Sequence, residues 1–195
     1  MKVIGAVLLS TTVLAFVPVA YSFQADTGKE TRKTGSANRM NEGSATADHA
    51  FAMKAAEGGM AEVELGNLAK QNGSNSAVKD FGQRMVDDHS KANNELKDLA
   101  GKQNITLPTA MNSQDQAEKD RLSKLTGHAF DRAYMKMMVT DHRKDVAEFK
   151  RESTSGKNPD LKAWAGKTLP TLQEHLKMAE DTERQVSSGK AATTK

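Results

Sequence analysis

Apolar residues recur at intervals of three and four along four long stretches of the chain. This spacing puts them on one face of an α-helix, so it predicts amphipathic helices. The four predicted long helices cover residues 47–72, 76–103, 127–153 and 158–186. A shorter helix is predicted over 113–125, and no stretch has the strict alternation of polar and apolar residues that is typical of a strand.

Residues that start or stop helices separate these stretches. Gly73 is expected to end the first helix, and Ser74 or Ser76 to cap the second. Asn158 and Pro159 form a good cap and first turn for the last helix. Two helical hairpins joined by a long connection are therefore expected. This layout predicts an all-α, ferritin-like four-helix bundle, with a short extra helix in the connection between helices two and three.

The beginning of the chain has the composition of a secretory signal peptide. Lys2 precedes an almost wholly apolar run, Val3–Ala20, and Ala20 and Ser22 offer a cleavage site. A retained membrane anchor is the alternative, but the run is short for a membrane span and no basic cluster follows it. We therefore expect residues 1–22 to be removed, leaving no membrane span. The mature protein is expected to be periplasmic or secreted, with association to the outer membrane as an alternative.

Polar segments flank the helical region. Residues 23–46 and 187–195 contain too little apolar surface to offset the entropy of ordering them. They are predicted to be a disordered linker and a disordered tail, on either side of a bundle domain at 47–186.

Composition narrows the classes of function. The net charge is only +3, and no basic stripe with interleaved aromatic residues is present, which argues against a nucleic-acid partner. The chain has no cysteine, so disulfides and cysteine nucleophiles are excluded. No Ser-His-Asp arrangement is evident either. An enzyme is therefore not favoured, and a metal-dependent enzyme is the third interpretation after the two given below.

Each long apolar stripe is interrupted by one ionisable residue: Glu62, His89, His142 and His175. These residues lie roughly 11–19 positions from the turns, which at about 1.5 Å per residue places all four in one band near the middle of the bundle. Three imidazoles and a carboxylate are ligands for a divalent metal such as Zn, Cu, Ni, Mn or Fe. The leading interpretation is a metal site. The alternative is a structural or stress-related envelope protein, whose histidines form only a polar network with Glu62 or backbone carbonyls.

Two further patterns bear on the bundle. Residues 85–97 resemble residues 138–150, which puts His89 and His142 at equivalent positions and favours a duplicated hairpin or convergence of two similar helices. Gly58 and Gly59 lie inside the first helix, where each costs about 1 kcal/mol relative to alanine. Small neighbours such as Ala55 and Ala61 predict that helices approach closely there.

Several dispersed motifs together resemble one bacterial family: Phe51–Leu68, Phe81–His89, Ile105–Pro108, Phe130–Tyr134, Asp141-His142 and Thr168–Pro170. It is the domain of unknown function 4142 family, exported ferritin-like proteins often labelled predicted outer-membrane proteins. The resemblance covers about residues 46–184 and implies a ferritin-like helical bundle in the cell envelope. It implies no established activity, so no catalytic residue is carried over.

The chain departs from the di-iron chemistry of ferritins. Such sites use several glutamates and Glu-x-x-His pairs. Here Val86, Val139 and Leu172 stand three residues before the histidines. A single core carboxylate is too few to bridge two irons, so an iron oxidase or iron store is not expected.

Overall fold

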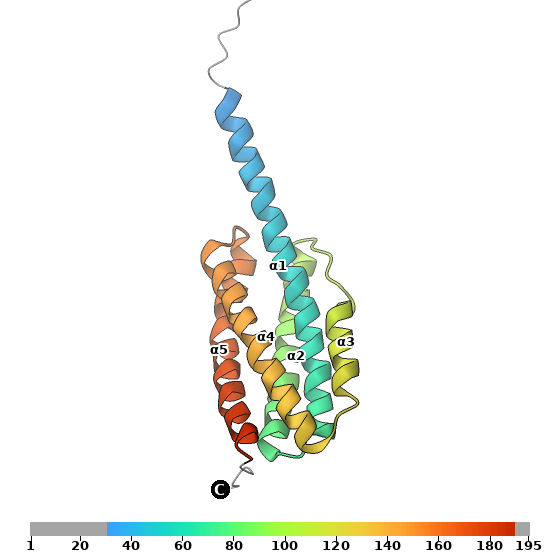
Figure 1. Cartoon of the computed structure of the whole chain (residues 1–195). Helices are drawn as coiled ribbons and strands as arrows, with labels where there is room; N and C mark the ends of the chain where they lie inside the picture. The colour runs from blue at the N-terminus through green and yellow to red at the C-terminus, as the bar shows by residue number, and fades with distance from the viewer. Residues whose placement is uncertain (1–30, 190–195) are drawn as a thin grey trace, which may run out of the picture.

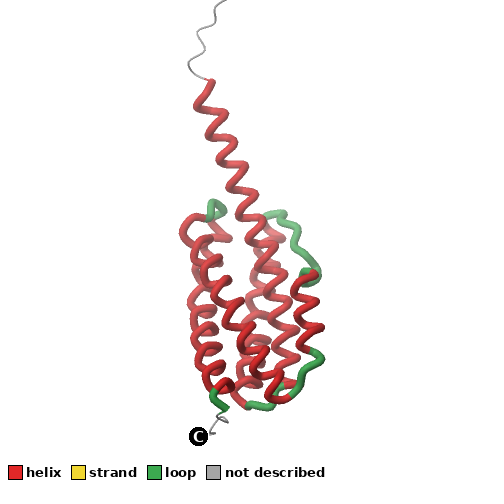
Figure 2. The backbone as a smooth tube through the Cα atoms, in the orientation of Figure 1, coloured by secondary structure: helices red, strands yellow, loops and turns green. Residues whose placement is uncertain are grey.

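The computed structural model describes the backbone of residues 31–189 and the side chains of residues 47–189. The predicted signal peptide lies outside these residues. The described part of the chain forms five α-helices and no strand (Figure 2), which confirms the predicted all-helical class. The helices are α1 (Thr31–Asn72), α2 (Ser76–Lys102), α3 (Ser113–Leu122), α4 (Gly127–Ser155) and α5 (Pro159–Ser187).

The four long helices lie side by side as a helical bundle, and the short α3 lies on the outside beside α1 (Figure 1). α1 and α2 form one hairpin, and α4 and α5 form the other. The connection between the hairpins contains α3 and returns along the length of the bundle. α2 and α4 therefore start at the same end and run in the same direction. No described helix combines the length and the apolar character needed to cross a membrane.

The ends of α1 and α5 differ from the expected boundaries. α1 already begins at Thr31, and its first part extends beyond the other helices (Figure 1), so residues 31–46 are helical where a linker was expected. α5 ends at Ser187, one residue beyond the predicted end of the bundle domain. The remainder of the predicted linker, and the tail from residue 190, lie outside the described residues.

The turn between α1 and α2 shows why the predicted serine cap is wrong. Asn75 caps α2, and its side chain accepts a hydrogen bond from the backbone N–H of Ala77. The hydroxyl of Ser74 instead donates to the carboxylate of Asp131 on α4. A contact between distant segments therefore engages the hydroxyl of Ser74, and the next residue, Asn75, caps the helix instead. At α5, Asn158 caps the helix as predicted.

Two buried aspartates tie each hairpin to the turn of the other. Asp131 on α4 accepts hydrogen bonds from the backbone N–H groups of Ser74 and Asn75, at 3.0 and 3.1 Å. Asp48 on α1 accepts bonds from the backbone N–H groups of Lys157 and Asn158 in the turn between α4 and α5. The two contacts lie at opposite ends of the bundle, and together they fix how the hairpins are placed along its axis.

The apolar core consists of two clusters. One contains Phe81, Tyr134 and Met138 among others, and the second contains Phe51, Phe149 and Trp164. Along α2 the buried side chains pass from Met85 in the first cluster, through His89, to Leu96 in the second. The predicted ionisable residues therefore lie between the two clusters, in a polar layer that crosses the bundle.

Candidate metal centre

Three histidines from three helices meet in this polar layer. His89 of α2, His142 of α4 and His175 of α5 each present one nitrogen, and these nitrogens lie within 4.8 Å of one another. Their ring centroids are 5.4–5.9 Å apart. All three side chains are buried, and His142 is completely inaccessible. The structure thus brings together the three histidines that the apolar periodicity singled out.

Neighbouring groups fix the orientation of two of the imidazoles. Nδ1 of His142 lies 3.0 Å from the carbonyl oxygen of Met138, one turn earlier in α4. Nε2 of His175 lies 2.9 Å from the carboxylate of Asp88 on α2. Because a carbonyl and a carboxylate can only accept, each of these nitrogens carries the proton. The opposite nitrogen of each ring is left with a free lone pair.

One buried nitrogen of each ring has no hydrogen-bond partner: Nε2 of His89, Nε2 of His142 and Nδ1 of His175. For His142 and His175 these are the nitrogens that carry the lone pairs. Leaving a buried polar group unsatisfied costs about 1–3 kcal/mol. Three such atoms in neighbouring side chains indicate that the layer can hold a ligand that pairs with these nitrogens.

The electrostatic surroundings keep the histidines neutral. Burial lowers the pKa of His89 well below its usual value, and repulsion from His142 and His175 acts in the same direction. Burial also lowers the pKa of His142, to about 4. For His175, burial lowers the pKa although the hydrogen bond with Asp88 partly offsets this effect. Neutral imidazoles at neutral pH are ready to coordinate a metal without first losing a proton.

Asp88 is the charged group that supports the cluster. Against the effect of its partial burial, hydrogen bonds with His175 and Arg84 lower the pKa of Asp88. Its carboxylate therefore stays ionised and holds the proton of His175 on Nε2. A carboxylate behind a metal-binding histidine commonly orients the ring and raises its basicity.

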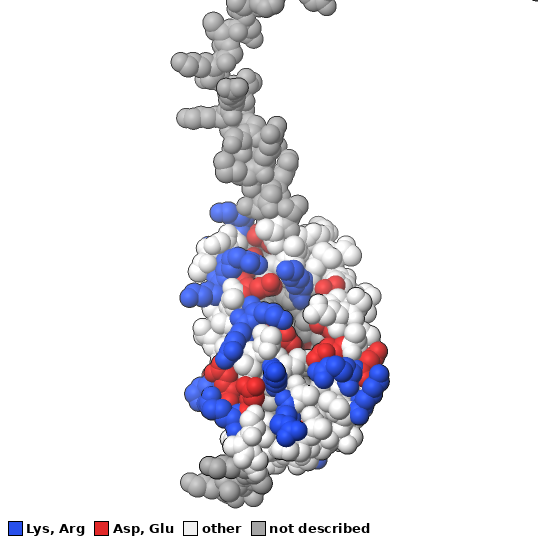
Figure 3. Space-filling model, viewed as in Figure 1, with Lys and Arg blue, Asp and Glu red and all other residues white. Residues whose placement is uncertain are grey.

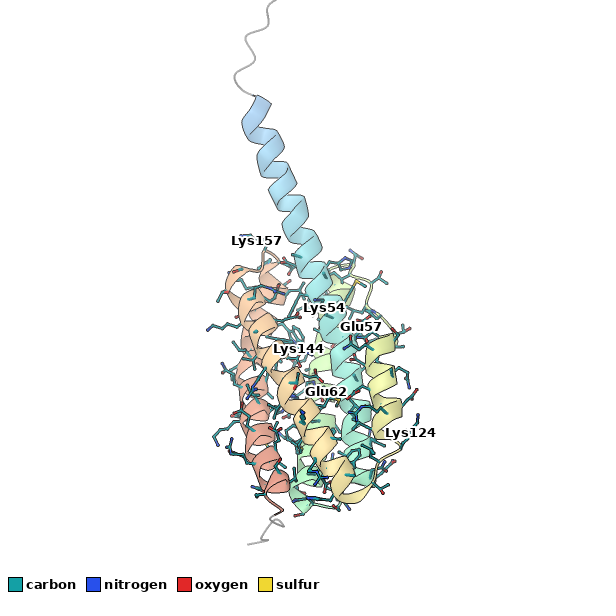
Figure 4. The ribbon with its side chains drawn as sticks, in the orientation of Figure 1. Lys54, Glu57, Glu62, Lys124, Lys144 and Lys157 are labelled. Carbon is teal, nitrogen blue, oxygen red and sulfur yellow. The ribbon has the colours of Figure 1, made fainter. Side chains whose placement is uncertain are left out.

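Glu62 lies beside the histidines but is not a member of the three-residue group. Its carboxylate is 3.9 Å from Nδ1 of His142, the nitrogen already bonded to Met138, and it lies between α1 and α4 (Figure 4). Its Oε2 is buried without a partner. Burial raises the pKa of Glu62 well above its usual value, as do the charges of Asp145 and Asp141. The four predicted residues are thus neighbours, with three as candidate ligands and Glu62 next to them.

The cost of ionising the buried carboxyl of Glu62 leads to a first prediction. Glu62→Gln removes the cost of ionising a buried carboxyl, so the metal-free variant should be more stable than the wild type by about 1–3 kcal/mol at pH 8. Since the folded-state pKa is raised, this penalty is absent well below pH 4.5 and grows as the pH rises above it. Urea unfolding at pH 4 and pH 8 measures the difference.

The exposed Glu64 on the same helix provides the control. Glu64→Gln should change the free energy of unfolding by only a few tenths of a kcal/mol at either pH, because exposed ion pairs contribute little. Equal effects of the two variants at pH 8 would show that ionising Glu62 in the core has no cost in free energy.

Periodicity missed the groups that support the histidines. Asp88 precedes His89 in the chain and points about 100° away from it around α2, yet that direction leads to His175. Asp145, three residues after His142, is half-buried, and burial together with the charges of Asp141 and Glu148 raises its pKa to about 7. His49 and His128 are exposed.

The histidine geometry fits a metal ion after a small contraction. Bonds of 2.0–2.1 Å to a tetrahedral Zn²⁺ put ligand nitrogens about 3.4 Å apart. The nitrogens here lie within 4.8 Å of one another, so shifts of about 1 Å bring them to one ion. Three nitrogen ligands also leave a fourth position free for water or another small ligand.

These features define a class: an all-helical bundle protein with a buried layer of three histidines at its centre. Residues 32–182 match the model of a domain of unknown function, DUF4142, and the chain belongs to this family. Neither the curated proteins nor the solved structures that were compared give a match to the chain.

Proposed function

We propose that this protein binds one divalent metal ion in the bundle core through His89, His142 and His175. Two observations carry the proposal: the three rings present nitrogens close enough to share one ion, and each buried ring has one nitrogen without a partner. Imidazole ligands suit Zn, Cu, Ni or Fe, and Mn is bound less readily by nitrogen. Glu62 lies next to His142, where an ionised carboxylate offsets part of the charge of the metal.

The alternative, a structural protein whose histidines form only a polar network, has less support. Hydrogen bonds to Met138 and Asp88 use one nitrogen each of His142 and His175, but the other nitrogen of each ring remains unpaired. A self-sufficient network leaves few buried polar atoms unsatisfied. A bound cation satisfies all three nitrogens at once.

The proposal includes the ferritin-like arrangement and the envelope location predicted from sequence. Two helical hairpins joined by a long connection support the first. The apolar run Val3–Ala20 after Lys2, with Ala20 and Ser22 before the cut, supports export. N-terminal sequencing of protein recovered from the periplasmic fraction tests this part. Recovery from the cytoplasm, with Met1 retained, would contradict it.

Metal analysis tests the binding site. The mature protein, purified without a histidine tag, is incubated with ZnCl₂, passed through a desalting column and analysed for zinc. We expect about one zinc per chain, since three nitrogens plus one open position complete a single tetrahedral ion. His89→Ala, His142→Ala and His175→Ala should each retain less than about one tenth of this amount.

The exposed histidines provide matched controls. His49→Ala and His128→Ala should bind as much zinc as the wild type, because neither lies in the core. Circular dichroism confirms that each variant is folded, and His142→Gln serves if the alanine variant is not. A wild type that retains no zinc, copper, nickel, manganese or iron would leave the polar-network alternative.

A further inference from the structure

Among the glycines at 47–102 whose surroundings the structure describes, Gly58 is the one in the middle of a helix that has no packing explanation. At Gly59 a side chain would collide with Asn93, and at Gly66 it would collide with the backbone of Gly82, so the predicted close approach of helices explains both. At Gly58 an added Cβ would meet no atom within 4 Å. Glycine nevertheless destabilises the helix there by about 1 kcal/mol relative to alanine.

Gly58 lies where two hollows of the protein adjoin. The outer hollow is an open groove of about 860 Å³ between α1, α3 and α4. The inner hollow is a cavity of about 80 Å³ that reaches His89. Both are lined by Lys54, Gly58, Asp145 and Glu148. A Cβ at position 58 would enter open space at the residues that the two hollows share.

The inner cavity is of the right size for a small hydrated ion. A water molecule needs about 10–15 Å³ of such space, whereas an engineered cavity of about 150 Å³ holds benzene. The cavity beside His89 therefore has room for a few waters but not for a larger organic molecule. It also contains a polar group without a partner, the buried indole Nε1 of Trp164, besides Nε2 of His89.

The outer groove carries an excess of negative charge. Seven carboxyl groups line it against four basic side chains, and without Glu62 and Asp145, whose pKa values are raised, the carboxylates still outnumber the basic side chains. Acidic side chains lie in and beside the hollow on the face that Figure 3 shows, and Glu57 and Glu62 mark its α1 side in Figure 4. A cleft lined by one sign of charge raises the local concentration of ions of the opposite sign. At its inner end Oε2 of Glu62 is buried without a partner.

One ion pair crosses the space above Gly58. Lys54 of α1 lies 3.4 Å from Glu148 of α4, and 63% of the lysine side chain is exposed. Such an exposed pair contributes at most about 1 kcal/mol. It therefore opens readily and does not seal the passage.

We propose that divalent cations reach the three-histidine site through this passage, from the acidic groove past Gly58 to His89, and that Gly58 keeps the passage open. The inference rests on the proposed metal-binding function. It assigns the α1–α4 face a role in metal uptake and release, whereas the histidines determine whether metal binds at all.

Rates of metal exchange test the passage. Uptake of Co²⁺ by the metal-free protein is followed by stopped-flow absorbance, and its removal by excess EDTA is followed in the same way. Gly58→Leu fills the passage and should slow both processes at least tenfold, with the cobalt content at saturation unchanged. A blocked route changes the two rates by the same factor because it leaves the equilibrium untouched.

Two matched variants control for side effects. Gly58→Ala adds a single carbon where space is available and should stay within twofold of the wild type. Gly101→Leu makes the leucine substitution at another open position, near the end of α2, and should also leave both rates unchanged. Wild-type rates in Gly58→Leu would overturn the passage while leaving metal binding intact. A wild type that takes up no cobalt would instead refute the binding function.

A second measurement does not depend on Gly58→Leu folding well. The double variant Glu57→Gln, Glu118→Gln removes two groove carboxylates that are outside the histidine layer. It should slow cobalt uptake severalfold at low ionic strength and much less in 0.5 M KCl, where salt screens the groove. Uptake that is independent of both the variant and the salt would also overturn the proposal.

Discussion

Asp131→Ala is expected to lower the free energy of unfolding by about 3–5 kcal/mol, a large part of the 5–15 kcal/mol that stabilises a typical domain. The carboxylate is fully buried and accepts three hydrogen bonds, from the backbone N–H groups of Ser74 and Asn75 and from the hydroxyl of Ser74. Its removal leaves two backbone donors near the α1–α2 turn without an acceptor. Urea denaturation at pH 7 measures the loss.

Two comparisons separate this role from a general effect of losing a carboxylate. Asp131→Asn keeps one acceptor oxygen and should cost less than the alanine variant, while Asp98→Ala, on the exposed side of α2, should be close to neutral. Asp48→Ala should resemble Asp131→Ala, because Asp48 holds the opposite turn through Lys157 and Asn158. Near-neutral Asp131→Ala would show that the turn finds other partners.

The aspartate contacts illustrate what a sequence does and does not reveal. The core of each helix follows from local spacing alone: Val78, Phe81 and Met85 are all buried, as their positions at intervals of three and four predict. The cap of α2 does not follow from local spacing, because serine and asparagine are equally good cap residues. The contact of Ser74 with Asp131, which comes from another helix, leaves Asn75 as the cap. Contacts between segments far apart in the chain decide between residues that are locally equivalent.

The same distinction applies to the candidate site. The height of each histidine along its helix is set by counting residues, so His89, His142 and His175 were placed in one layer from sequence. Counting residues does not determine the rotation of each helix about its axis. This rotation directs Asp88 toward His175 and places Glu62 beside His142 rather than among the candidate ligands. The passage past Gly58 depends on a missing side chain between two helices. In the sequence, only the glycine inside the helix indicates this passage. Close packing of helices explains such a glycine equally well until the structure shows the space around it.

Saturating the metal-free protein with zinc is expected to raise its melting temperature by roughly 12–16 °C at pH 7. Zinc at a thousand times its dissociation constant stabilises the folded state by about 4 kcal/mol. For a domain of roughly 140 residues, each kcal/mol corresponds to about 3–4 °C. Differential scanning calorimetry of the wild type with and without zinc measures the shift, and His142→Ala should show almost none of it. His128→Ala, which lacks only an exposed imidazole, should retain the whole shift.

The pH dependence of this stabilisation distinguishes a core site from a cluster of surface histidines. Burial holds the pKa of His142 at about 4 and lowers the pKa values of His89 and His175, so protons compete little with zinc at pH 6. Three exposed imidazoles with a pKa near 6.5 would instead lose roughly 60-fold in zinc affinity between pH 8 and pH 6. Affinity that falls this steeply would contradict coordination by the buried histidines.

The free energy of unfolding of the metal-free protein should also depend on pH, because the histidines bind protons less readily in the folded state than in the unfolded chain. The folded histidines resist protonation, whereas in the unfolded chain they take up protons below about pH 6.5. The contribution of these histidines to the free energy of unfolding should therefore be greatest above pH 6.5 and decrease as the pH falls toward 4, the folded-state pKa of His142, whereas the penalty of ionising Glu62 becomes smaller over the same range and acts in the opposite direction. Zinc should offset this decrease until protons displace it from the imidazoles. The difference in the free energy of unfolding between the wild type and His142→Gln isolates the histidine contribution, because the carboxyl groups are common to both proteins. A difference that is constant from pH 7 to pH 4.5 would mean that His142 is not buried in the neutral form, and the metal site would lose its physical basis.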